Sequence, residues 1–230
     1  MDRPPLLEVE NLRFRYPDGP AALAGVNFRL EEGETIALLG PNGAGKTTFL
    51  HLLVGLLNGQ GRVQVVGRPV DQTNIAFARS QIGLLFQDSN DQLFMPTVAE
   101  DVAFGPANAG YEEHEVRQRV RQALETVGLA DVGERPPHHL SAGQKRLAAL
   151  AGILAMEPKM ILLDEPATFL DPPARAHLIE TLRALPQAKI VVTHDISLAR
   201  ALAQRAVFFE NGRIVAEGSV DEVVQARSWL

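Results

Sequence analysis

The stretch Gly40-Pro-Asn-Gly-Ala-Gly-Lys-Thr-Thr48 lies between the apolar run 36–39 and a helix-compatible run at residues 49–54. It has the G-x-x-x-x-G-K-[ST] spacing of a phosphate-binding loop, in the strand–loop–helix order that such a loop requires. Glycines let successive backbone N–H groups turn toward an anion, and the following helix directs its positive end at the same point. A chance glycine-rich turn is the alternative. The context favours a loop that binds a nucleoside triphosphate.

Within this loop, the side chains of Lys46 and Thr47 have the chemistry to act on the triphosphate. The Lys46 ammonium is expected to reach the terminal phosphates, and the Thr47 hydroxyl is expected to join the ligand shell of a Mg²⁺ ion. The loop therefore predicts a bound nucleoside triphosphate with Mg²⁺, and the family resemblance given below implies that the nucleotide is ATP. The predicted nucleotide-binding loop comprises Gly40, Pro41, Asn42, Gly43, Ala44, Gly45, Lys46, Thr47 and Thr48.

Composition limits the class of protein. The chain has 230 residues, 46% of them hydrophobic, a net charge of −6 and no cysteine. This length suits one large domain with room for an inserted lobe, and the charge argues against a broad nucleic-acid-binding face. The absence of cysteine excludes disulfides and thiolate metal sites. The first residues do not resemble a signal peptide, and the longest apolar run is too short to span a membrane.

The hydrophobic pattern predicts an antiparallel β patch from strands at residues 6–16 and 26–30, and further strands at 61–66, 81–86, 160–163 and 189–193. Helices are predicted at 112–127, from Ser141 onward and at 172–185, with a hairpin around Asn211-Gly212 and a short capped helix after Ser219. Residues 88–106 show little periodicity. We expect a single domain over residues 1–230, with a catalytic core of 1–87 and 141–230 and a mainly helical lobe at 88–140.

Several buried strands end directly at polar residues: Gln87 follows one, Asp164 and Glu165 another, and His194 a third. If helices connect these strands, the sheet is mainly parallel and its carboxyl edge gathers the polar residues around one triphosphate. We predict Asp164, Thr47 and Gln87 near the Mg²⁺ ion. Catalytic roles are predicted for Glu165, which would orient or deprotonate water, for His194 at the γ-phosphate, and for Gln87 and Lys46. Each residue alone could equally be an ordinary loop residue.

The stretch Leu140-Ser-Ala-Gly-Gln144 begins a helix with a second potential anion site at its N-terminus. One chain has no obvious second triphosphate to place there. Two chains facing head to tail would solve this, each presenting Ser141, Ala142, Gly143 and Gln144 to the nucleotide of the other. An ordinary capped helix is the alternative.

Taken together, the phosphate loop, Gln87, the Ser141 stretch, Met160-Ile-Leu-Leu-Asp-Glu-Pro166, Asp171 and His194 resemble the ordered motif set of ATP-binding-cassette (ABC) ATPases. The resemblance covers essentially the whole chain. It implies an α/β fold of the P-loop NTPase type, with a mainly parallel central sheet, an antiparallel β patch and an inserted helical lobe. It also implies that Tyr16 stacks on adenine and that Asp171 communicates across a dimer.

The inserted lobe is similar to that of energy-coupling-factor ATPases, which power importers of cobalt, nickel and vitamins. Gln87-Asp-Ser-Asn-Asp-Gln-Leu-Phe94, residues 100–106 and residues 154–158 carry this similarity. In that family the segment after the glutamine docks a transmembrane coupling protein, a role that Phe94 and Met95 would suit unless they are core residues of the lobe. Two positions depart from the ABC pattern: Ala142 replaces a glycine, and Phe169 replaces a small residue.

The expected function is therefore an ATPase subunit that energises cobalt or nickel import at the cytoplasmic face of the cell membrane. Its expected partners are itself or a paralogous ATPase, a transmembrane coupling protein and a substrate-specific membrane component, with no nucleic acid. The alternatives are a biotin or other vitamin importer, a non-transport ABC ATPase acting on nucleic acid or ribosomes, or a regulatory module without turnover. The six histidines show no metal-ligand spacing.

Overall fold

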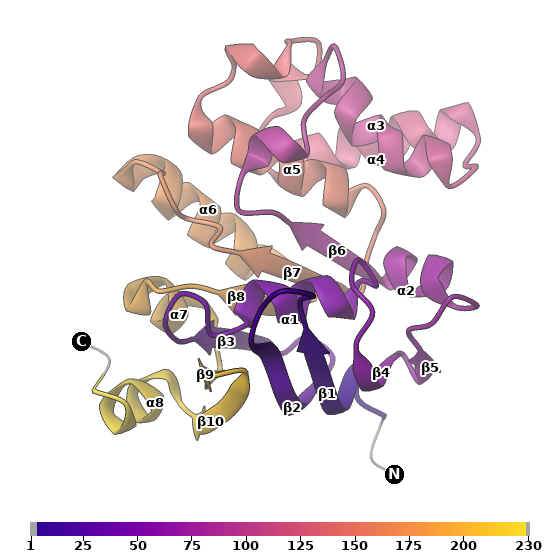
Figure 1. The fold of residues 1–230 in the computed structure, drawn as a ribbon. Coiled ribbons are helices and arrows are strands. Elements are labelled where there is room, and N and C mark those ends of the chain that lie inside the picture. Colours follow the sequence, from indigo (N-terminus) through magenta and orange to yellow (C-terminus); the bar gives the residue numbers. More distant parts are fainter. Residues whose placement is uncertain (1–3, 229–230) are drawn as a thin grey trace. The chain divides into compact units, whose positions relative to one another are not determined.

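The computed structural model describes residues 4–228 and divides the chain into two compact units (Figure 1). Unit 1 comprises Met1–Leu84, Lys159–Glu165 and Pro186–Leu230, and unit 2 comprises Leu85–Pro158 and Pro166–Leu185. Unit 2 is larger than the expected lobe at 88–140, because two further helices, at residues 142–154 and 172–184, pack with it.

The six-stranded sheet of unit 1 has the order β10-β9-β3-β8-β7-β6. Its centre is parallel: β3 (Thr35–Leu39) pairs with β8 (Ala188–Val192) and β9 (Arg205–Glu210), and β8 also pairs with β7 (Met160–Asp164). All residues of β3, β7 and β8 are buried. Strands buried on both faces read as continuous apolar runs, which is why the sequence identified them. The carboxyl ends of β3, β7 and β8 therefore lie at one edge (Figure 1).

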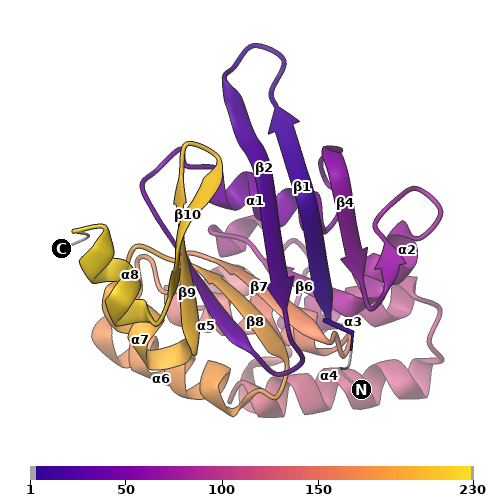
Figure 2. The same ribbon diagram turned by 90° about the horizontal axis from the view of Figure 1, so that it is seen from below.

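A second, antiparallel sheet has the order β2-β1-β4-β5 (Figure 2). Its members are β1 (Leu7–Arg15), β2 (Ala21–Leu30), β4 (Gln60–Val65) and the short β5 (Arg68–Pro69). Helix α1 (Lys46–Leu53) packs on β2 and β7, with Phe49 fully buried against Phe28 and Phe209. The predicted antiparallel patch is confirmed.

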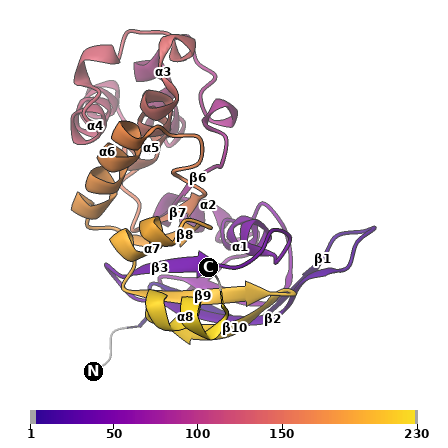
Figure 3. The same cartoon turned by 90° about the vertical axis from the view of Figure 1, so that its left-hand side faces the viewer.

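The C-terminal part of unit 1 follows its local sequence signals. Strands β9 and β10 (Arg213–Gly218) form the predicted hairpin, and both turn residues, Asn211 and Gly212, have a positive φ as such two-residue turns require (Figure 3). Helix α7 (Ile196–Leu202) precedes this hairpin, and α8 (Val220–Ala226) follows it with the predicted Ser219–Glu222 capping box.

Unit 2 is helical. Helix α4 (Glu113–Thr126) matches the predicted helix, and α5 (Ala142–Leu154) and α6 (Pro172–Ala184) begin at the predicted caps Ser141 and Asp171. Helix α3 (Val98–Asn108) packs on α4 and α5, and α5 packs on α6 (Figure 3). Three single-turn 3₁₀ helices complete the unit: η1 (Ser89–Asp91), η2 (Ala130–Val132) and η3 (Pro137–His139).

The sequence analysis missed three helices: α3 in unit 2, and α2 (Ile75–Gln81) and α7 in unit 1. In α3 the buried positions 98, 101, 102 and 106 do have helical spacing, but they include the charged Asp101 and Pro106, which hide the apolar stripe. The Thr97–Glu100 capping box was the signal that could have identified α3. Helix α2 buries only Ala78, so its amphipathic pattern is weak.

Candidate functional site

The glycine loop of unit 1 is held so close to neighbouring backbone that two of its positions admit only glycine. At Gly40, with φ of 135°, a Cβ atom would lie 2.2 Å from the Phe209 carbonyl oxygen. At Gly45, with φ of 102°, it would lie 2.3 Å from the Ala22 carbonyl oxygen. Gly45 is also the N-cap of α1, and no side chain caps this helix. The N–H groups of the first turn of α1 therefore lack a side-chain cap, as an anion-binding helix start requires.

Lys46, the first residue of α1, lies buried in this loop with only 8% of its surface exposed. Its Nζ donates hydrogen bonds to the carbonyl oxygens of Gly40 (2.7 Å) and Pro41 (2.9 Å). Burial lowers the pKa of Lys46, while the nearby carboxylates of Glu165 and Asp164 act in the opposite direction. A desolvated ammonium of this kind gains free energy when an anion arrives beside it.

Asp164 ends β7 beside α1 and is 5% exposed. Burial raises the pKa of its carboxyl group above the ordinary value, and a hydrogen bond from the Thr47 side chain opposes that effect. Oδ1 of Asp164 is buried and has no hydrogen-bond partner among the described residues. An unpaired carboxylate oxygen next to a threonine hydroxyl fits the hard oxygen ligands that Mg²⁺ prefers. Asp164 and Thr47 could thus hold the ion.

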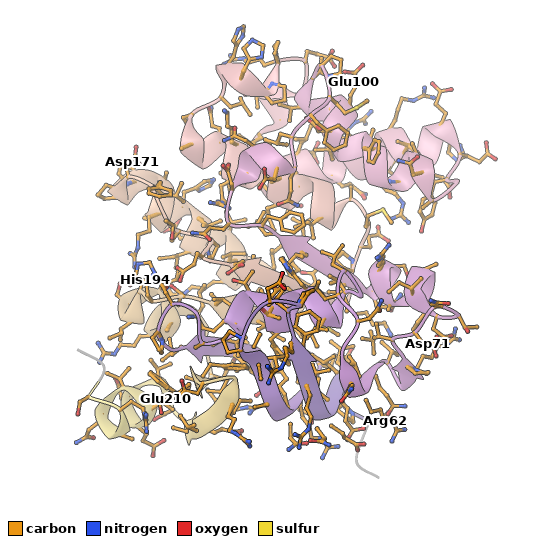
Figure 4. The ribbon with its side chains drawn as sticks, viewed as in Figure 1. Arg62, Asp71, Glu100, Asp171, His194 and Glu210 are labelled. Atoms are coloured by element: carbon orange, nitrogen blue, oxygen red, sulfur yellow. The ribbon has the colours of Figure 1, made fainter. Side chains whose placement is uncertain are left out.

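Glu165 and His194 meet at the ends of the adjacent strands β7 and β8. His194 follows β8 (Figure 4). Its Nδ1 lies 3.0 Å from Glu165 Oε2, and the two side chains are 65% and 14% exposed. The Glu165 N–H donates to the Val192 carbonyl oxygen (2.9 Å), and the residue has φ of 46°. A left-handed conformation costs a non-glycine residue about 1 kcal/mol. Such strain persists where the surroundings fix the residue, as at many reaction centres.

Tyr16 follows β1, and its ring is 42% exposed. Its hydroxyl lies 3.2 Å from Thr48 Oγ1 in the first turn of α1, and its ring packs edge-on against Phe14 at 4.9 Å. The structure thus brings six predicted residues together in unit 1: Tyr16, Lys46, Thr47, Asp164, Glu165 and His194. An exposed aromatic ring beside a phosphate loop offers a stacking surface for a base.

The other predicted residues, Gln87, the Ser141 stretch and Asp171, belong to unit 2. Ser141 Oγ accepts the Gln144 N–H (3.2 Å), and Gln144 Oε1 accepts the Ser141 N–H (3.0 Å), so both residues form a closed capping box. At Gly143 a Cβ atom would lie 2.6 Å from the Ala174 Cβ, so α5 and α6 require glycine there. Ala142 begins α5 and is absent from the positive-φ positions, so its methyl group causes no backbone strain.

Asp171 and Phe169 lie in the loop that precedes α6. Asp171 caps this helix by accepting the Ala174 N–H (2.8 Å; Figure 4). Phe169 is 90% exposed and has φ of 64°, an unusual conformation for a bulky side chain. Sequence reasoning noticed Phe169 as a departure from the ABC pattern, but it could not show this exposure.

The structure also adds a residue that sequence reasoning missed, Arg146. It is 4% exposed in α5, and its guanidinium donates to the carbonyl oxygens of Phe86 (2.6 Å) and Gln87 (2.7 Å). The available signal was a charged residue on the otherwise apolar face of α5. Among residues 4–228, no group of three or more histidine, cysteine, aspartate or glutamate side chains is arranged to hold a metal ion. No helix in this range is long and apolar enough to cross a bilayer.

Comparison with known proteins identifies the family. The family model described as "ABC transporter" matches residues 23–168. A putative ABC transporter ATP-binding protein of Streptomyces avermitilis is 52% identical over 96% of this chain and 84% of its own length. The energy-coupling factor transporter ATP-binding protein EcfA of Methanocaldococcus jannaschii is 45% identical over 95% and 80%, respectively.

Two solved structures share the fold. CbiO1 of Clostridium perfringens, part of the ABC transporter complex cbiONQ, superposes with a TM-score of 0.87 at 37% identity, covering 97% of this chain and 92% of its own. A dimer of the ATP-binding cassette MJ0796 bound to ADP and Pi gives 0.81 at 28% identity, covering 93% and 98%. The predicted P-loop NTPase fold is therefore confirmed. With its phosphate loop and the carboxylates of β7, the chain belongs to the ABC transporter family and is an ABC-type ATPase.

Proposed function

We propose that this chain is the ATP-hydrolysing subunit of an energy-coupling-factor-type importer of cobalt or nickel. The observation that carries this proposal is the exposed aromatic pair of unit 2, Phe94 and Phe104, in the segment that follows Gln87. Phe94 is 61% exposed and Phe104 45%, and the rings pack edge to face at 4.9 Å. Neighbouring exposed aromatic side chains of this kind mark interaction sites.

A buried carboxylate fixes the backbone that presents this pair. Asp101 Oδ1 accepts the N–H groups of Phe94 and Met95, both at 3.0 Å, while Oδ2 is buried with no hydrogen-bond partner among the described residues. Asp101 is 8% exposed, and burial raises its pKa despite the two backbone hydrogen bonds. The two hydrogen bonds therefore fix the backbone at Phe94 and Met95, although one carboxylate oxygen is left buried and unpaired.

Unit 2 also has a groove of about 530 Å³ that is lined by residues of α3 and α4. Its lining combines apolar side chains with charged side chains of both signs, which suits an amphipathic helix of the transmembrane coupling protein. The lining residues include Ala99, Glu100, Ala103, Val116, Arg117, Val120, Arg121, Leu124, Asp131 and Glu134.

Hydrolysis is proposed to require two chains arranged head to tail. In each site Lys46 would hold the phosphates, Thr47, Asp164 and Gln87 would surround Mg²⁺, and Tyr16 would stack on adenine. Glu165 would activate water and His194 would contact the γ-phosphate. Ser141 to Gln144 of the second chain would cover the nucleotide, with Asp171 at the interface. The dimeric state of the MJ0796 relative supports this arrangement. A homodimer is favoured because one chain carries every group, and a paralogous ATPase is the other candidate.

The proposed cargo rests on the relatives. CbiO1 belongs to the complex cbiONQ, and the residues after Gln87 resemble ATPases of cobalt, nickel and vitamin importers. The ATPase itself would not contact the cargo. It would lie peripherally at the cytoplasmic face of the membrane, bound to the coupling protein, which in turn holds the substrate-specific component.

The test is to tag the chain in its own host, isolate it from detergent-solubilised membranes and identify the proteins that accompany it. We expect two integral membrane proteins, and uptake of radiolabelled cobalt or nickel after reconstitution. Phe94→Ser should abolish the association, whereas Leu56→Ser, which removes a 51%-exposed side chain of unit 1, should preserve it. Uptake of biotin or another vitamin would show that the importer carries a vitamin and not a metal ion. Co-purification with RNA or ribosomes instead of membrane proteins would overturn the proposal.

A further inference from the structure

The guanidinium of Arg146 joins the start of α5 to the segment that contains Gln87. It is anchored in the second turn of α5, directly after the Ser141–Gln144 capping box. Its two terminal nitrogens donate separately to consecutive carbonyl oxygens, those of Phe86 and Gln87. Two hydrogen bonds from one planar group to neighbouring peptides fix the orientation of both peptide planes. Every atom involved belongs to unit 2.

Neighbouring contacts make this connection stiff. Lys145 Nζ donates to Asn90 Oδ1 (3.0 Å), so a second α5 side chain holds η1. Asp88 Oδ1 accepts both the backbone N–H and the side-chain amide of Asn90, each at 2.8 Å. The Phe86 N–H donates to Gln92 Oε1 (2.9 Å), which closes the segment on itself. Residues 86–92 and the first two turns of α5 thus form one hydrogen-bonded block.

We propose that Arg146 is a positioning residue that couples the two nucleotide sites of the ATPase dimer. This inference rests on the proposed function, in which Gln87 acts on the nucleotide of its own chain and Ser141 on that of the second chain. Because Arg146 ties the backbone of Gln87 to the helix that Ser141 caps, a shift of Ser141 toward one nucleotide moves Gln87 relative to the other. The occupancy of one site is thereby sensed at the other site.

The coupling depends on the shape of the guanidinium as well as on its charge. A lysine ammonium retains the charge, but it is a compact point donor on a flexible stem and lacks the planar fork of arginine. Arg146→Lys therefore keeps a buried cation in α5 while it releases the fixed orientation of the Gln87 peptide. A residue that merely stabilises the fold would affect the thermal midpoint and leave the interaction between the two sites intact.

The experiment measures ATP hydrolysis by the purified full chain for the wild type, Arg146→Lys, Arg146→Met and the control Arg62→Met. Arg62 is a 57%-exposed arginine of β4, so its replacement controls for the loss of a cation (Figure 4). For the two Arg146 variants we expect kcat to fall about 10-fold, since misplacement by about 1 Å is enough to cost up to 100-fold. The Hill coefficient for ATP should fall toward one, with nucleotide affinity of the phosphate loop unchanged.

A double-mutant cycle between Ser141→Ala and Gln87→Ala sharpens the result. In the wild-type background the two changes should be non-additive in kcat, and in the Arg146→Lys background they should become additive. Arg146→Lys keeps the test valid if Arg146→Met fails to fold. If Arg146→Lys retained both the cooperativity and the non-additivity, the coupling role of Arg146 would be overturned, and the proposed dimer would be unaffected. A wild type that neither associates with ATP nor shows cooperativity would instead overturn the proposed dimer.

Discussion

The phosphate loop of unit 1 and the start of α5 in unit 2 are both suited to bind phosphate, but their polar groups are in opposite conditions. In unit 1 the charges are held at a cost: Lys46 is buried with a lowered pKa, Asp164 has an unpaired buried oxygen, and Glu165 has a left-handed backbone. In unit 2 the Ser141 hydroxyl and the Gln144 amide satisfy each other.

This difference indicates how the work is divided. Buried, unpaired charges gain most when a ligand of opposite charge arrives, so unit 1 has the features of a reaction centre. A satisfied helix start gains little by itself, which fits the proposed role of the Ser141 stretch as a preformed surface that covers the nucleotide of a second chain. The predictions below test this division.

The largest effect is expected for Glu165→Gln. The amide keeps the size of the side chain but cannot accept a proton from water, so kcat should fall by about 10²–10⁴-fold. ATP binding should persist, and dimers should accumulate with ATP. Phosphate release and light scattering measure the two effects. Turnover close to that of the wild type would remove Glu165 from the catalytic role.

Ser141→Arg should have the next largest effect. It breaks the capping box and places a bulky side chain where the second chain's nucleotide would approach, so kcat should fall about 100-fold, the loss typical when a transition-state donor is removed. The phosphate loop should still bind ATP with wild-type affinity. Full activity of a variant that stays monomeric under saturating ATP would show that unit 1 completes the reaction without a second chain.

These two residues also show what sequence alone could establish. The continuous apolar strands and the caps Ser141, Asp171 and Ser219 were predicted because each signal is local. The adjacency of Glu165 and His194 followed from the parallel order of the strands that they end. Helix α3 and Arg146 were not predicted, because Asp101 and Arg146 are buried charges whose partners are backbone atoms. A backbone carbonyl or N–H is present in almost every residue, so the sequence does not show which residue a buried charge is paired with.

Removing the buried charge of Asp164 tests whether this carboxylate destabilises the nucleotide-free chain. Burial raises the pKa of its carboxyl group, so the ionised carboxylate opposes folding as pH rises through the unfolded and then the folded pKa. Asp164→Asn should therefore stabilise the nucleotide-free chain by about 1 kcal/mol, because a neutral amide costs less to bury than an ionised carboxylate, while it weakens Mg²⁺-dependent hydrolysis. Urea denaturation and ATPase assays measure both.

Lys189 is the matched control, a buried cation of β8 that is 4% exposed. Burial lowers its pKa from the ordinary 10.5 to about 8, so the unfolded chain binds more protons and stability should rise as pH increases above 8. Lys189→Met should remove this rise and leave hydrolysis unchanged. If Lys189→Met raised the free energy of unfolding while Asp164→Asn did not, burial of the Asp164 carboxylate would not destabilise the nucleotide-free chain.

The smallest effect is expected at Phe169, the one strained residue near the start of α6 in unit 2. Its φ of 64° should cost about 1–2 kcal/mol, a penalty that glycine avoids and alanine retains. Phe169→Gly should therefore be more stable than Phe169→Ala by about 1 kcal/mol, or about 2–4 °C in thermal midpoint. Unchanged hydrolysis in both variants would show that backbone strain at Phe169 has no role in catalysis, in contrast to the strain expected to matter at Glu165 in unit 1. Both variants lack the aromatic ring, whereas only Phe169→Ala keeps the strained backbone. A loss of ATP-dependent association in both would therefore show that the ring makes the contact between two chains, and that unit 2 tolerates the strain at Phe169 for that contact.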